Sequence, residues 1–541
     1  MREKNSGSKS FGKQFFSGIA ILAISTVIVK VIGLLYKIPM MAYLGAEGMG
    51  YFNSAYDIYS LFFVIATAGI PVAISILISE NKTQGRHKNI KKIFNISLII
   101  LSIIGIIGTA LLALFHDQFA KIIKNDAASY CILAISPTIL LVCLSSAIRG
   151  YFQGNQIMAP TAISQVIEAL GKLLLGLGFA IIAINKGYAV PMVAAFAVLG
   201  LTLGVALSLL FLVFYKIIYK QKTTITPISP KVDKSSAIVK SLFDIAIPIT
   251  LSSTILSLSK VIDMTMILSR LNAIGYTQEQ ANSIYGSYST MAVSIYNLPA
   301  TLISAIALPL VPLLTSAVES KDIEKEKSVI SLSFKTTALI SFPAGIGIAV
   351  FSKPILQLLF ASQASEIEYT APLLSSLGLS VFLSGMITIT NAILQAYKQV
   401  KKPIISMVIG VAVKMISSFV LIGIPSINIY GAPISTFFSL LAMVTINLYF
   451  IIKRAKKVNT VFNLFGRSFI ASILSIAIGI GFYSLINTMY SSKLIILITI
   501  FIIIVIYCIS VIKLKAIGKN EILMLPHGEH IYNLLTKIHL M

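Results

Sequence analysis

Apolar segments long enough to cross a lipid bilayer occupy most of this chain, and that feature decides its fold class. A spanning helix needs about 20 mostly apolar residues. Inside a bilayer every backbone polar group must be bonded internally, so such segments form helices. The sequence therefore predicts an all-α polytopic membrane protein with about 14 spans, at roughly residues 16–44, 51–79, 92–115, 127–148, 159–184, 188–215, 240–269, 284–315, 328–351, 367–394, 403–424, 430–452, 464–487 and 494–512.

Composition agrees with this assignment and excludes other classes. Of the 541 residues, 57% are hydrophobic and only 11% are charged, and the mean hydropathy is +0.91. Soluble domains carry about 25% charged residues. The net charge of +24 suits nucleic-acid binding in a soluble protein. In a chain this apolar it is instead expected in loops, so a soluble enzyme, a disordered chain and a nucleic-acid binder are excluded.

The basic residues are distributed unevenly between alternate loops. With the N-terminus inside, the loops on the inner side hold 30 Lys and Arg residues and those on the outer side hold 6. Cytoplasmic loops carry such an excess. We expect a multi-pass protein of the cell membrane with both termini in the cytoplasm. The first apolar segment is too long for a signal-peptide core, so it is expected to remain as the first span.

An internal repeat relates two blocks of six spans. Lys30-Val31-Ile32 matches Lys260-Val261-Ile262, and Lys172 matches Lys414, at offsets of about 230 and 242. An even number of spans inserts both copies the same way round, an arrangement known in alternating-access transporters. The predicted organisation is an N-terminal lobe (1–220), a cytoplasmic linker (221–238), a C-terminal lobe (239–454), two further spans (455–515) and a cytoplasmic tail (516–541).

Charged side chains within the predicted spans are the candidate functional groups. A charge at the bilayer centre costs at least about 2.5–3.5 kcal/mol on insertion scales. If these groups face the space between the lobes, lysines outnumber acids, which suits an anionic substrate such as a diphosphate. The structural alternatives are a snorkelling Lys37 and self-neutralising pairs of Glu168 with Lys172 and of Lys260 with Asp263. The candidates are Lys30, Lys37, Asp57, Glu168, Lys172, Lys260, Asp263 and Lys414.

Metal and redox chemistry have no support in the sequence. Cys131, Cys143 and Cys508 lie in apolar stretches without the spacing of a metal or disulfide motif. None of the five histidines falls in the middle of a span. We predict no cofactor, no metal and no catalytic residues.

One segment carries a family resemblance. Arg149-Gly150-Tyr151-Phe152-Gln153-Gly154, followed by Pro160-Thr161-Ala162 and Ser164-Gln165-Val166, resembles the SpoVB/YtgP branch of the polysaccharide-transport and MATE-like (MOP) superfamily. That branch includes MurJ-type lipid II flippases. Lys30 is similar to a cavity-lining basic residue of their first helix. The Asp-Arg pair usual in their eighth helix is replaced here by Ala292-Val293-Ser294-Ile295-Tyr296.

The resemblance implies a flippase rather than an enzyme. Its substrate would be an undecaprenyl-diphosphate-linked saccharide, above all the peptidoglycan precursor lipid II, moved from the inner to the outer leaflet. The expected partners are this lipid-linked anionic saccharide, membrane lipids and a coupling ion of unknown identity, with no nucleic acid. The alternatives are a cation-coupled multidrug antiporter of the same superfamily and export of another lipid-linked unit, including a sporulation-specific role.

Overall fold

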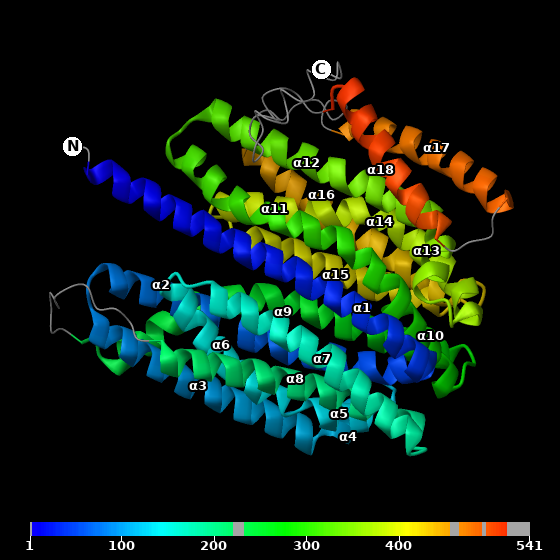
Figure 1. The fold of residues 1–541 in the computed structure, drawn as a ribbon, viewed down its shortest axis with the longest axis horizontal. Coiled ribbons are helices and arrows are strands. Elements are labelled where there is room, and N and C mark those ends of the chain that lie inside the picture. Colours follow the sequence, from blue (N-terminus) through cyan, green and yellow to red (C-terminus); the bar gives the residue numbers. More distant parts are fainter. Residues whose placement is uncertain (1–2, 220–231, 455–464, 490–493, 517–541) are drawn as a thin grey trace. The chain divides into compact units, whose positions relative to one another are not determined.

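The computed structural model describes residues 3–219, 232–454, 465–489 and 494–516, and within them the protein is helical (Figure 1). The predicted linker (221–238) and tail (516–541) lie largely outside the described residues. The helices are α1 (Glu3–Thr67), α2 (Ile70–Thr83), α3 (His87–Leu114), α4 (His116–Ile122), η1 (Asp126–Ala128), α5 (Ser129–Ile135), α6 (Thr138–Gly154), α7 (Ala159–Asn185), α8 (Val190–Ile218), α9 (Ser235–Ala273), α10 (Gln278–Ser287), η2 (Tyr288–Ala292), α11 (Val293–Glu319), α12 (Ile323–Val350), α13 (Ser352–Leu359), α14 (Ala364–Ala396), α15 (Lys401–Ile422), η3 (Asn428–Tyr430), α16 (Gly431–Arg454), α17 (Arg467–Met489) and α18 (Ile495–Lys513).

The predicted spans correspond to these helices, and the all-α membrane fold is confirmed. Among the described residues, 12 helices are long and apolar enough to cross a membrane. One of them, Ile24–Thr83, covers both of the first two predicted spans. The sequence predicts a break near residues 45–50, and within α1 two helices meet at a kink at Gly45, whose φ of 66° is not helical. Glycine adopts this left-handed conformation without a Cβ penalty, so the two arms of α1 meet there without a loop.

The eighth predicted span is divided into three pieces. A capping box, in which the Thr277 hydroxyl and the Gln280 side chain bond each other's backbone N–H, starts α10. The π-helical turn η2 then joins α10 to α11. Such π-helical turns are frequent at functional sites.

Contacts divide the chain into two compact units, Met1–Thr290 and Met291–Met541. In the first unit α1 packs against α7, α9 and α10, and α7 packs along α8. The helix α9, which begins the predicted C-terminal lobe, therefore has its contacts in the first unit. The division into an N-terminal lobe (1–220) and a C-terminal lobe (239–454) that move during transport stays a prediction.

The second unit repeats the packing of the first. The order α2, α3, α6, α7, α8 corresponds to α11, α12, α14, α15, α16, with the same helices in contact. In the first unit Lys82 Nζ, at the end of α2, donates to the carbonyl of Asn155, 2.8 Å away beside the end of α6. In the second, Lys398 Nζ beside the end of α14 bonds Glu319 at the end of α11, at 2.9 Å. The first bond joins the end of α2 to the end of α6, and the second joins the end of α11 to the end of α14. These are corresponding helices of the two units, as expected for a duplication.

The last two spans form a pair of their own within the second unit. Helix α18 packs along α17, and α17 packs against α12. The Tyr507 hydroxyl of α18 donates to the carbonyl of Leu339 in α12 at 2.8 Å. Figure 1 shows α17 and α18 side by side in orange and red. The pair lies outside the repeat, as the sequence predicts.

Candidate functional site

Four lysines from three helices of the first unit form the candidate site. Lys30 and Lys37 lie two turns apart on α1, Lys172 lies on α7, and Lys260 lies on α9. The charge of Lys30 interacts with that of Lys260, and the charge of Lys172 interacts with those of Lys30 and Lys37. The side chains of Lys30 and Lys260 are exposed, and those of Lys37 and Lys172 are half-buried. We call these four residues the lysine cluster.

Lys172 is held against aromatic rings rather than against an acid. Its Nζ lies 4.5 Å from the ring centre of Tyr56, 5.1 Å from that of Tyr36 and 5.7 Å from that of Phe52, all on α1. A cation over an aromatic face is stabilised by the ring quadrupole, typically by ~0.5–2 kcal/mol. The three rings therefore surround the position of the Lys172 amine.

Asp57 is an acidic residue of α1 whose charge interacts with lysines of the cluster. It interacts electrostatically with Lys37 and Lys260, and also with Asp263 on α9. The Tyr285 hydroxyl of α10 donates to its Oδ2 at 2.5 Å. Asp57 and Asp263 are both half-buried. The structure thus brings two predicted acids to the edge of the lysine cluster.

Glu168 does not form the ion pair with Lys172 that its spacing favours. Its Oε2 accepts a bond from Arg149 Nη2 at 2.9 Å. Arg149 falls between the predicted spans at 127–148 and 159–184, but it lies within α6 and is only 8% exposed. Arg149 Nε donates to Ser164 Oγ and Nη2 donates to Ser208 Oγ, both at 3.0 Å. Glu168 is thus ion-paired with Arg149 and interacts with the charge of Lys172 without an ion pair to it among the described residues.

The remaining candidate, Lys414, is half-buried in α15 of the second unit. Sequence reasoning missed Tyr285 and the three rings around Lys172, because their partners are distant in the chain. It singled out Arg149 only as part of a motif. An arginine in so apolar a chain, with Ser164 and Glu168 in the following span, is the signal that could have revealed the buried bonds of Arg149.

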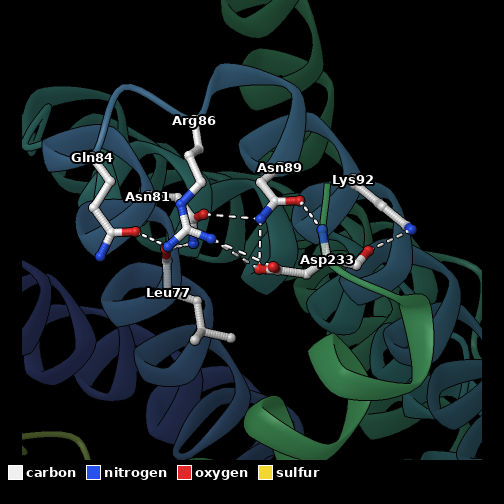
Figure 2. Close-up of polar contacts among 7 residues, drawn as sticks. All are labelled: Leu77, Asn81, Gln84, Arg86, Asn89, Lys92 and Asp233. Carbon is white, nitrogen blue, oxygen red and sulfur yellow. Dashed lines mark hydrogen bonds and ion pairs between the residues drawn. The ribbon is translucent and has the colours of Figure 1, made fainter. Parts of the chain in front are cut away.

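A second polar cluster lies where the chain enters α9 (Figure 2). Asp233 Oδ2 accepts from Asn89 Nδ2 at 2.6 Å, and its own backbone N–H donates to Asn89 Oδ1 at 3.0 Å. Arg86 forms an ion pair with the same carboxylate at 3.4 Å. Lys92 Nζ donates to the Asp233 carbonyl at 2.7 Å. The segment before α9 is thus bonded to the hairpin of α2 and α3.

No group of three or more His, Cys, Asp or Glu side chains in the described part of the chain could hold a metal ion. Cys131, Cys143 and Cys508 are free cysteines. Lysine binds phosphate as a point charge.

Two family models match the chain. The model described as polysaccharide biosynthesis protein matches residues 15–318, more than half of the chain. The chain belongs to the polysaccharide biosynthesis protein family. The MatE model matches residues 248–420. The two matches confirm the predicted resemblance to the polysaccharide-transport and MATE-like (MOP) superfamily.

Similar proteins point the same way. The "Lipid II flippase MurJ" of Bacillus subtilis (strain 168) is 27% identical over 421 residues, which are 75% of this chain and 77% of that protein. A solved structure of lipid II flippase MurJ in an inward closed conformation gives a TM-score of 0.67 at 17% identity, covering 91% of this chain and 98% of that one.

An inward-facing multidrug resistance MATE family transporter of the MOP superfamily also gives a TM-score of 0.67, at 16% identity, covering 81% of this chain and 100% of that one. These likenesses establish the fold that the two transport proteins share. The protein is a multi-pass membrane transporter of the MOP superfamily and not an enzyme.

Proposed function

We propose that this protein is a flippase for a polyprenyl-diphosphate-linked saccharide, namely the peptidoglycan precursor lipid II. The lysine cluster carries this proposal. Lys30, Lys172 and Lys260 have, among the described residues, no hydrogen bond or ion pair, and a charge in a membrane span is a functional site by default. A diphosphate is the anion that such ammonium groups suit.

The mechanism needs binding and movement but no covalent step. The diphosphate and sugar are bound by Lys30, Lys37, Lys172 and Lys260 while the polyprenyl chain stays in lipid. Alternating access then exposes the head group on the outer side. Both termini face the cytoplasm in this proposal, as the excess of basic residues on one set of loops indicates. The similarity to a protein named lipid II flippase supports the choice of substrate.

Complementation tests the proposal most directly. The gene is expressed in bacteria depleted of their own lipid II flippase, and membrane levels of the protein are followed by immunoblot. We expect the natural chain to restore growth and Lys30→Ala to lose rescue at equal protein level. The matched control is Lys240→Ala, which removes an exposed lysine of α9 twenty residues before Lys260. This variant is expected to rescue fully.

Two results would overturn parts of the proposal. Failure of the natural chain to rescue, with the protein present in the membrane, would move the substrate to another lipid-linked unit, such as one used in sporulation. Full rescue by Lys30→Ala would remove Lys30 from the site.

A multidrug antiporter is the second candidate, and the match to the MatE model favours it. Cationic drugs require acidic side chains at the binding site, whereas lysines dominate the cluster described here. Efflux of a cationic dye from cells expressing the protein would decide between them. We expect no efflux above that of cells carrying an empty vector, and dye export that Lys30→Ala leaves unchanged would support the antiporter.

A further inference from the structure

Glu168 and Lys172 lie one turn apart on α7, with the acid first, which is the order that favours an ion pair. The Glu168 carboxylate nevertheless bonds Arg149 of α6 at 2.9 Å. Lys172 makes ring contacts with α1 and, within the residues that the structure describes, neither a hydrogen bond nor an ion pair. The acid that could neutralise Lys172 is therefore bonded to a different cation, and it acts on Lys172 through its charge without bonding it.

Arg149 is fixed in place independently of Glu168. Its guanidinium also donates to Ser164 on α7 and to Ser208 on α8, each at 3.0 Å. The planar guanidinium is always charged and presents its donors in a rigid fork. Two hydroxyl acceptors on neighbouring helices therefore hold this fork where Glu168 can reach it.

At the corresponding place in the second unit, the described residues have an amide pair where the first unit has Arg149 and Ser208. Asn391 on α14 and Asn447 on α16 lie about 240 residues after Arg149 and Ser208, and they bond each other at 2.7 Å. Two neutral amides thus join these helices in the second copy of the repeat. Because helix packing there needs no ion pair, the Arg149–Glu168 pair of the first unit calls for an explanation beyond packing.

We propose that Arg149 is a positioning residue that withdraws Glu168 from Lys172 and so leaves the Lys172 charge available to an anionic diphosphate. This inference rests on the proposed function and deepens it, since it identifies what keeps the site cationic. A free carboxylate one turn from Lys172 would take the ammonium from the aromatic rings and cancel its charge. Arg149 thereby acts on the substrate through two other side chains.

Binding of a diphosphate probe to four variants tests the proposal. Purified full-length protein in phosphatidylcholine nanodiscs is titrated with geranylgeranyl diphosphate. We expect Arg149→Met to weaken binding at least about tenfold, which corresponds to ~1.4 kcal/mol. Adding Glu168→Gln to this variant is expected to restore the affinity to within about threefold. In a Lys172→Met background, Arg149→Met is expected to cause no further loss.

A purely structural role for Arg149 predicts a different result. Replacing both Arg149 and Glu168 would then weaken binding of the probe at least as much as replacing Arg149 alone. Equal or weaker binding by the double variant than by Arg149→Met would overturn the proposal.

A second readout needs no substrate and separates this inference from the proposed function. Acetic anhydride modifies only unprotonated amines, and modification of Lys172 can be followed by peptide mass spectrometry. We expect less Lys172 acetylation in Arg149→Met, where Glu168 would hold the ammonium, and recovery when Glu168→Gln is added. Should the natural chain bind no probe, the proposed function fails while this pattern still supports the role of Arg149. Unchanged acetylation across all variants would overturn the role itself.

Discussion

The Tyr285 hydroxyl donates a hydrogen bond to the Asp57 carboxylate at 2.5 Å, joining α10 to α1 across 228 positions of sequence. Both residues lie on helices that carry or border the lysine cluster. Asp57 interacts electrostatically with Lys37 and Lys260. The tyrosine therefore fixes the position of the acid that most closely balances these lysines.

Replacing Tyr285 by phenylalanine removes this bond and the hydrogen bond between Tyr285 and Ser289. A hydrogen bond to a charged group contributes about 1.5–3 kcal/mol, so we expect Tyr285→Phe to lower the thermal unfolding temperature of the detergent-solubilised protein measurably. Tyr130→Phe is the matched control, because Tyr130 is 52% exposed and also belongs to the first unit. An equal unfolding temperature for both variants would contradict the importance of the bond.

The Asp233 cluster leads to a second prediction. Asn89 is fully buried and bonds the Asp233 side chain, the Asp233 backbone and Asn81 Oδ1 (Figure 2). Its loss would leave buried polar atoms without partners, at about 1–3 kcal/mol for each. We expect Asn89→Ala to speed amide hydrogen exchange in the first turn of α9, which follows Asp233.

The control for this prediction lies next to it in the chain. Lys88 is exposed, so Lys88→Ala should leave exchange in α9 unchanged. Exchange that is equally slow in Asn89→Ala would mean that the start of α9 is held by its other contacts, and the cluster would then lose its assigned role.

Close packing of α7 on α8 leads to a third prediction. A Cβ added at Gly200 would lie 2.3 Å from the Gly176 backbone, whereas one added at Gly178 would meet nothing within 4 Å. Overpacking costs about 1–3 kcal/mol, and alanine in place of an unhindered helical glycine gains up to about 1 kcal/mol. We expect Gly200→Ala to destabilise the protein and Gly178→Ala to stabilise it slightly. Thermal unfolding measures both, and changes of the same sign would refute the packing argument.

Hydropathy along the sequence was sufficient to predict the positions of the membrane spans. The bilayer requires about 20 apolar residues per span, so the predicted span at 159–184 agrees with α7 at Ala159–Asn185. The break predicted after residue 44 agrees with the structure, because the non-helical φ and ψ of Gly45 separate two helices within α1. The repeat was predicted from the matches of Lys30 with Lys260 and of Lys172 with Lys414, and corresponding helices of the two units make the same contacts.

The partners of buried charges were not predictable in the same way. Spacing within one helix suggested an ion pair of Glu168 with Lys172. Glu168 instead bonds Arg149, which lies 19 positions earlier and on another helix. Likewise, nothing near Asp57 in sequence points to Tyr285. The lysines could be named as candidates because a charge in an apolar span stands out; their contacts depend on the packing of helices that are distant in the chain.

The electrical potential across the membrane provides the last prediction. If the lysines bind an anionic diphosphate but remain in the protein as the head group crosses, negative charge moves outward. A potential that is negative inside favours this by ~2.3 kcal/mol per charge for each 100 mV. We therefore expect purified protein in liposomes to translocate a fluorescent polyprenyl-diphosphate sugar faster when valinomycin and a potassium gradient make the cytoplasmic side negative. Reversing the gradient should slow it. The control is the same liposomes at equal potassium concentrations, which carry no potential. Translocation at one rate under all three conditions would mean that cations of the protein or a coupling ion move with the substrate, so that no net charge crosses.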